Sequence, residues 1–180
     1  EEFLRIVLNC GDETGMAPEM AVRECLRAGL EKPSVWSVIM PNNYVLLPGF
    51  DVDPKDVEQR KLHDAPRRIE AVADAIRDGR RIIDVVHGPM PRLKTHLVWP
   101  LFRRWGIFPS KFRATDACIA CGKCVRACPV KNVTAGEEGR PRWGKNCTSC
   151  LACYHVCPVN AVQYGSMTRG KGQYFFPFGQ

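Results

Sequence analysis

The chain has 180 residues, 45% of them hydrophobic, which suffices for one ordinary domain and a small second module. Its net charge of +7 lies in the second part, because residues 1–110 hold 16 basic and 16 acidic side chains whereas 111–180 hold ten and three. We find no run of 18 apolar residues and no secretory leader pattern, so we expect a cytoplasmic chain without a transmembrane helix.

The first hundred residues alternate between predicted strands and helices. Mainly apolar runs at 4–10 and 34–40 indicate buried strands. Apolar stripes predict helices over 19–29 and 64–79, the second with Pro66 inside its first turn. The order strand, helix, strand, long loop, helix is typical of an α/β unit that contains a parallel pair of strands.

The run at 4–10 reads as a central strand covered on both faces, which needs neighbouring strands along both edges. A single partner at 34–40 cannot supply them, and the sequence enters this first strand almost at once. We therefore expect that an N-terminal segment is missing or that a second chain completes the sheet.

Residues 86–114 form a basic aromatic linker that contains no acidic side chain. The stretch 95–108 predicts a short amphipathic helix, which Pro100 and Pro109 limit. Three interpretations stay open: a tether packed on the α/β domain, contact with an anionic membrane surface, or docking of a partner protein. The basic and aromatic side chains are Arg92, Lys94, Trp99, Phe102, Arg103, Arg104, Trp105, Phe108, Lys111, Phe112 and Arg113.

Eight of the ten cysteines form two copies of one pattern, Cys-x-x-Cys-x-x-Cys-x-x-x-Cys-Pro. The copies are offset by 29 residues throughout, which indicates a pseudo-twofold module. Such a run is typical of bacterial-type iron–sulfur proteins and predicts two [4Fe–4S] clusters. The first copy is Cys118, Cys121, Cys124 and Cys128, and the second is Cys147, Cys150, Cys153 and Cys157.

The fourth cysteine of each run ligates the other cluster in proteins of this type. We expect it to start a short helix that points away from its own run. Small residues between the ligands leave room for loop N–H groups to approach the cluster sulfurs. Cluster 1 is therefore assigned Cys118, Cys121, Cys124 and Cys157, and cluster 2 is assigned Cys147, Cys150, Cys153 and Cys128.

Zinc and disulfide bonds are the competing interpretations of so many cysteines. Zinc sites usually take cysteines as two separated pairs, and disulfides belong to oxidising compartments. Neither suits two tight triples in a chain that we expect in the cytoplasm. We expect Cys10 and Cys25, which lie outside the runs, to be free thiols that are buried or half-buried.

With these runs, residues 116–164 resemble a two-cluster bacterial ferredoxin module. The resemblance implies a small α+β ferredoxin-like domain, here 115–180. The aromatic tail at 174–178 is expected to pack on that domain as a strand or arm. His155 lies inside the second run, and we expect it either at the surface or close enough to tune the cluster.

A loop Cys-Gly-Asp-Glu-Thr-Gly after the first strand and the Met-Pro-Asn-Asn-Tyr ending of the second resemble flavodoxin–ferredoxin fusion proteins. The resemblance implies that 1–85 is a partial flavodoxin-like α/β domain whose N-terminal part is missing. It also implies an FMN site made by Gly11, Thr14, Gly15 and Tyr44, at the carboxyl ends of the strands. The same residues also suit ordinary turn glycines and a packing tyrosine.

The expected function is electron transfer through two clusters, to or from a flavin or a redox partner protein. An acidic partner fits, because the cluster half keeps about +3 after two clusters of about −2 each are counted. A pI near 9 also suits nucleic acid, but we recognise no recognition helix or aromatic platform and expect no such partner. We recognise no catalytic side chains; as an enzyme the chain would be an oxidoreductase, either an iron–sulfur subunit of a larger complex or a flavin-dependent reductase.

Overall fold

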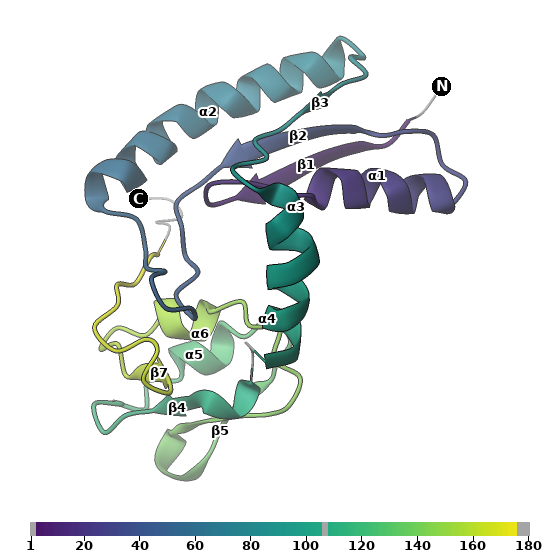
Figure 1. Cartoon of the computed structure of the whole chain (residues 1–180). Coiled ribbons are helices and arrows are strands. Elements are labelled where there is room, and N and C mark those ends of the chain that lie inside the picture. The colour runs from purple at the N-terminus through teal and green to yellow at the C-terminus, as the bar shows by residue number, and fades with distance from the viewer. Residues whose placement is uncertain (1–2, 106–107, 176–180) are drawn as a thin grey trace. The chain divides into compact units, whose positions relative to one another are not determined.

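The computed structural model describes residues 3–105 and 108–175, the side chains of Arg103 and Trp105 excepted. It divides the chain into two compact units (Figure 1). Unit 1 comprises Glu1–Asn42 and Asp53–Leu101, and unit 2 comprises Asn43–Val52 and Phe102–Gln180. This division differs from the expected boundaries at 85 and 115, because the loop 43–52 packs within unit 2 and the linker is shared between the units.

Unit 1 holds a three-stranded parallel sheet in the order β1-β2-β3. β1 (Arg5–Cys10) and β2 (Ser34–Ile39) pair along their whole length, which confirms the predicted parallel pair. β3 (Ile83–Asp84) adds a short parallel strand on the other side of β2, and the sequence did not predict it. β2 is therefore the central strand of the described sheet.

Two helices flank this sheet on opposite faces (Figure 1). α1 (Ala17–Arg27) has a proline in its first turn. Backbone N–H groups of that turn have no acceptor within the helix, so a proline there removes no helical hydrogen bond. α2 (Lys55–Arg77) covers Trp36, which is 1% exposed and packs against Val72 and Ala75. The indole thus forms the centre of the apolar core of unit 1.

α2 begins at Lys55 rather than near residue 64, so the predicted start was wrong. Asp56 and Glu58 lie in its first turn, where the positive end of the helix dipole stabilises acidic side chains. Pro66 consequently lies inside the helix and is exposed. Water can therefore bind the carbonyl that lacks its usual donor, which makes this proline tolerable.

β1 is an edge strand of the described sheet, not the buried central strand that its composition suggested. Its side chains alternate between exposed and half-buried, and Val7 is 50% exposed. β2 instead has five consecutive buried residues, because it has a strand on each side and α2 above it. The expected N-terminal segment or second chain beside β1 stays a prediction.

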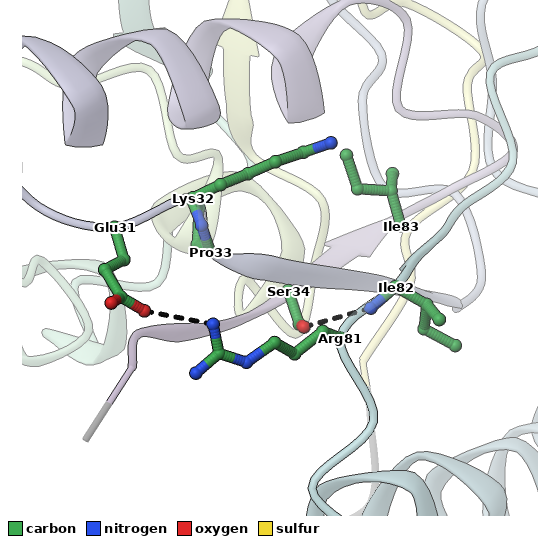
Figure 2. Close-up of a pocket in the computed structure, with 7 residues that line it drawn as sticks. All are labelled: Glu31, Lys32, Pro33, Ser34, Arg81, Ile82 and Ile83. Atoms are coloured by element: carbon green, nitrogen blue, oxygen red, sulfur yellow. Dashed lines mark hydrogen bonds and ion pairs between the residues drawn. The ribbon is translucent and has the colours of Figure 1, made fainter. Parts of the chain in front are cut away.

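The amino ends of β2 and β3 are joined by side chains around an open pocket (Figure 2). Arg81 pairs with Glu31 at 3.1 Å. Ser34 Oγ accepts a hydrogen bond from the backbone N–H of Ile82 at 3.1 Å and donates to the carbonyl of Arg80 at 3.1 Å. Open α/β sheets bind ligands at the opposite, carboxyl ends of their strands, so these contacts serve to hold β3 in register.

The linker is largely helical, and its helical stretch begins at Pro91 rather than at residue 95 as predicted. It runs through α3 (Pro91–Leu93), the π-helical turn η1 (Lys94–Val98) and α4 (Trp99–Trp105). The wider turn directly precedes Pro100, which lacks an N–H donor and crowds the preceding turn of a regular helix. Among the described residues, no helix is long and apolar enough to cross a membrane.

The linker contributes contacts inside each unit. In unit 1, Lys94 Nζ donates a hydrogen bond to the carboxylate of Glu13. In unit 2, the rings of Phe102 and Tyr44 meet edge to face with centroids 5.9 Å apart. The Lys94–Glu13 contact agrees with a tether packed on the α/β domain, whereas the Phe102–Tyr44 contact lies in unit 2, and docking to a membrane surface or to a partner protein stays untested.

Unit 2 contains two similar halves whose elements are offset by 29 residues, as the repeat predicted. Two antiparallel ribbons result, β4 with β7 and β5 with β6, and each takes one strand from each half. Short 3-10 turns, η2 (Pro109–Lys111) and η3 (Glu137–Gly139), precede β4 and β6. The first half has β4 (Phe112–Ala114), α5 (Lys123–Arg126) and β5 (Val133–Ala135), and the second has β6 (Pro141–Trp143), α6 (Ala152–His155) and β7 (Val162–Tyr164).

The backbone repeats at the same offset. Three pairs of residues have positive φ angles: Ala120 with Ser149, Gly122 with Leu151, and Lys131 with Asn160. Four matching hydrogen bonds also join the halves, since Thr115 N–H donates to Ala161 O as Gly144 N–H donates to Asn132 O, and Gly136 N–H donates to Arg140 O as Gly165 N–H donates to Lys111 O. The cysteine loops therefore have the same backbone shape in both halves.

Residues 43–52 belong to unit 2 because the C-terminal part of the chain binds them. Lys171 Nζ donates to the carbonyls of Val45 and Leu47, each at 2.7 Å. The N–H of Gly172 donates to Asp51 Oδ1 at 2.9 Å. Of the tail expected at 174–178, Tyr174 packs on the module through its N–H, which donates to His155 Nδ1 at 3.0 Å, whereas Phe175 is 64% exposed and 176–178 lie outside the described residues.

Candidate metal centre

A first cavity in unit 2 is lined by four cysteines: Cys118, Cys121, Cys124 and Cys157. The first three come from the first run and the last from the second run. The rest of the wall is mostly apolar and includes Ile119, Pro141, Val159 and Val162. Cys124 and Cys157 are buried, Cys118 is half-buried and Cys121 is exposed, so the cavity has one ligand at the surface.

A second cavity is lined by Cys147, Cys150, Cys153 and Cys128, three cysteines of the second run and one of the first. Most of its other lining residues lie 29 positions from those of the first cavity: Phe112 matches Pro141, Val130 matches Val159, and Val133 matches Val162. The two cavities are thus sites of one kind.

The short helices explain how one run reaches both cavities. α5 carries Cys124 and ends before Cys128, and α6 carries Cys153 and ends before Cys157. The expectation that the fourth cysteine starts a helix was therefore wrong. Gly122 and Leu151 adopt left-handed conformations that turn the loop into the helix. The single turn of helix then leads the chain from the third cysteine to the fourth, which lies at the other cavity.

Backbone N–H groups point at several of the sulfurs. Asn132 N–H donates to Cys128 Sγ at 3.1 Å, and the matching Ala161 N–H donates to Cys157 Sγ at 3.2 Å. In the second run, Ser149 N–H also donates to Cys147 Sγ at 3.4 Å. Such donors stabilise negative charge on sulfur, which is the charge that thiolate ligands and a cluster bring.

Burial affects the two most enclosed thiols that sit on the helices. It raises the pKa of Cys124, while the backbone N–H groups of Cys124 and Val125 lower it. It raises the pKa of Cys153 to about 11, while the nearby indole N–H of Trp143 lowers it. Both thiols hold their protons at neutral pH in the free protein, so binding of a metal must release them.

The residues present fit a cubane cluster in each cavity. Soft thiolates are the ligands of iron–sulfur clusters, and four of them surround each cavity. In the described part of the chain, no three Cys, His, Asp or Glu side chains converge closely enough to share one metal ion. A cubane does not require convergence, because each of its four irons takes one of the thiolates.

Three of the expected flavin residues lie on the loop after β1 in unit 1. A Cβ at Gly11 would overlap the side chain of Asn42 and would have to displace it. Thr14 Oγ1 donates a hydrogen bond to the carbonyl of Val86 at 2.9 Å. Gly15 has a φ of +55°, in the left-handed region. Each of these residues thus has a role in holding the loop.

Tyr44, the fourth expected flavin residue, belongs to unit 2. Its ring contacts those of Phe50 and Phe102 edge to face. Burial raises the pKa of its hydroxyl to about 12. The structure therefore assigns Tyr44 to a different compact unit from the other three residues, and the flavin site stays a prediction.

Of the two positions expected for His155, the one at the surface was wrong. It is 9% exposed, its Nε2 donates to the carbonyl of Asn43 at 2.7 Å, and its Nδ1 accepts from the N–H of Tyr174 at 3.0 Å. Burial lowers its pKa, which agrees with a neutral ring bonded in this way. His155 joins two segments that lie far apart in the sequence, and no local sequence pattern indicates such a role.

The family model described as the 4Fe-4S dicluster domain matches residues 117–161. The match spans both cysteine runs, from the residue before Cys118 to four residues after Cys157. No curated protein and no solved structure matches the chain. The chain therefore carries a ferredoxin-like iron–sulfur module of the kind that transfers electrons, whereas the match does not extend to the α/β unit.

Proposed function

We propose that the chain, which carries this 4Fe–4S dicluster module, transfers single electrons through two [4Fe–4S] clusters with crossed ligation. Cluster 1 takes Cys118, Cys121, Cys124 and Cys157, and cluster 2 takes Cys147, Cys150, Cys153 and Cys128. The observation that carries the proposal is the composition of the two cavities, each lined by three cysteines of one run and one of the other.

The protein's own residues supply what such a module needs. The clusters supply the redox-active iron when bound. The apolar walls keep water from the buried ligands, and the backbone donors of Asn132 and Ala161 stabilise charge on the two crossing sulfurs. The exposed Cys121 and Cys150 give each site one edge near solvent, where an electron can enter or leave.

Anaerobic purification of the full chain, followed by iron and sulfide counting, tests the central claim. We expect about eight irons per chain, and an EPR spectrum of the reduced protein with two interacting signals of spin one-half. A chain that binds four irons, or only zinc, contradicts the proposal.

Paired variants test the crossed ligation. If Cys128 belongs to cluster 2, the cluster that survives in Cys128→Ala has the same EPR signal as the one that survives in Cys147→Ala. It differs from the cluster that survives in Cys118→Ala. The control is Cys25→Ala, a half-buried cysteine outside both runs, which keeps the full iron content. A Cys128→Ala signal that matches Cys118→Ala would refute the crossing.

The partner that we propose is an acidic electron-transfer protein. Residues 111–180 hold ten basic and three acidic side chains, and two bound clusters leave about +3. Positive charge speeds the encounter with an acidic protein, and salt screens that attraction. We expect electron exchange with an acidic ferredoxin to slow steeply as salt rises. A rate that does not depend on salt contradicts this partner.

A flavin on unit 1 is a second candidate feature, favoured by the position of the Gly11 loop at the carboxyl end of β1. Open parallel sheets bind their ligands at this edge. The test is extraction of the purified chain and fluorescence of the extract, which also separates a flavin-dependent reductase from an iron–sulfur subunit. An extract without flavin, from a chain with its full iron content, rejects this candidate and leaves the electron-transfer proposal intact.

A further inference from the structure

The two halves of unit 2 share one backbone but differ in the hydrogen-bond donors of their side chains. Positions 114 and 120 of the first half are alanines, whereas the matching positions 143 and 149 of the second half are Trp143 and Ser149. An alanine side chain cannot donate a hydrogen bond, whereas an indole and a hydroxyl can. This difference falls on the residues around the second cavity.

Trp143 lines the second cavity and stacks on Phe112, with ring centroids 6.1 Å apart and planes inclined by 18°. Its Nε1 is buried and makes no well-formed hydrogen bond with any described residue, although it lies near enough to Cys153 to lower the pKa of that thiol. Buried N–H groups without a partner are rare, because the hydrogen bond to water lost on burial is not replaced. Cys153 lines the same cavity as Trp143, so the indole N–H faces a ligand of cluster 2. A cluster bound there would supply the missing acceptor.

Ser149 shows the same pattern from the cysteine loop. The residue is 8% exposed, and its Oγ is buried without a partner in the described structure. Its backbone N–H already donates to Cys147 Sγ at 3.4 Å, which places the residue beside a ligand of the second cavity. The hydroxyl is thus a second buried donor at this site that lacks an acceptor.

Other effects on the potential are more evenly matched. Both crossing sulfurs accept one backbone N–H, from Asn132 and Ala161. Each cavity has one exposed ligand, Cys121 or Cys150. The loops 116–126 and 145–155 each have one more basic than acidic residue, but Lys123 lines the first cavity and its counterpart in the second half is Ala152. Exposure of the ligands is therefore matched, whereas Lys123 favours reduction of cluster 1, so the two side-chain donors have to outweigh this cation for cluster 2 to be reduced first.

We propose that Trp143 Nε1–H and Ser149 Oγ–H donate to the sulfurs of cluster 2, so that cluster 2 has the higher potential and is reduced before cluster 1. The inference rests on the proposed function, since it requires two bound clusters. Reduction adds one negative charge to a cluster, and donors to its sulfurs stabilise the added charge. The reduced chain with one electron then holds it on cluster 2, which orders the path from cluster 1 to cluster 2.

The experiment is a reductive titration of the holo chain, followed by EPR, on the wild type and three variants. Trp143→Phe removes the indole N–H and keeps an aromatic ring against Phe112. Ser149→Ala reproduces the residue at position 120. Ala120→Ser is the matched control, because it adds a hydroxyl to the cavity of cluster 1. Iron is counted in every sample, so that loss of a cluster is not mistaken for a shift in potential.

We expect the wild type to reduce in two steps that differ at least tenfold in equilibrium constant, about 59 mV for one electron. Trp143→Phe and Ser149→Ala should each move the higher step towards the lower one and leave the lower step in place. Ala120→Ser should raise the lower step only. With eight irons present, a single step in the wild type, or variants that move the lower step, overturns the inference and leaves the proposed function standing. An iron count of four or less overturns both.

Discussion

The charge network around Lys61 allows a stability prediction for unit 1. Lys61 Nζ donates to Asp12 Oδ1 and to Asp53 Oδ2, each at 2.7 Å. The Lys61 and Asp53 side chains are only 11% and 9% exposed, so this pair is buried, whereas Asp12 is 63% exposed. The network ties the start of α2 to the loop after β1. Removing the lysine therefore leaves a buried carboxylate without its cation.

Lys61→Ala should destabilise unit 1 by about 2–3 kcal/mol. Breaking a buried ion pair by deleting one partner costs about 3–5 kcal/mol. The loss expected here falls just below this range, because the Asn42 backbone N–H and side-chain amide still donate to Asp53 at 2.9 and 3.2 Å. The exposed Asp12 adds little, since surface pairs contribute about 0–1 kcal/mol.

Hydrogen exchange followed by mass spectrometry on the holo chain measures this change in unit 1 alone. A loss of about 2–3 kcal/mol speeds exchange in α2 about 30- to 140-fold. The control is Lys55→Ala in the same helix, whose ammonium is exposed and pairs with Glu58 in the first turn. That pair is worth about 0.2–0.5 kcal/mol, which changes exchange less than about threefold. Equal effects of the two substitutions would refute the reasoning.

Three further predictions follow from the same kind of argument. The network should weaken in acid, because Lys61 lowers the pKa of Asp12 in the folded chain. The stability that ionised Asp12 contributes to unit 1 is present above its ordinary pKa of 3.8 and is lost as the pH falls through the folded value. Hydrogen exchange in α2, measured at decreasing pH, would show this loss. Trp36→Ala should cost about 3–5 kcal/mol in unit 1 by leaving a cavity under α2, and an unchanged exchange rate there would count against the packing. Lys171→Met should free the carbonyls of residues 45 and 47 and raise exchange in 43–52 while the iron content stays full; unchanged exchange would mean that other contacts hold this loop in unit 2.

The elements with strong local patterns could be predicted from the sequence. β2 and α1 fall where the apolar runs and stripes indicated, since burial of one face imposes a period on the sequence. The 29-residue repeat determined even more, because two segments with the same cysteine spacing form two matching backbones, down to the paired positive φ angles at 120 and 149. The choice of iron–sulfur chemistry followed from the spacing of the thiols alone.

Contacts between distant segments were decided only in the tertiary structure. The sequence shows neither that His155 binds Asn43 nor that Lys171 binds the loop at 45–47, because each contact joins residues more than 100 positions apart. The edge position of β1 also depends on which strands pair with it, which composition does not report. The apolar segments and cysteine spacings determined the local elements and the chemistry, whereas only folding could bring Trp143 and Ser149 beside one set of cysteines, because packing acts across the chain and not along it.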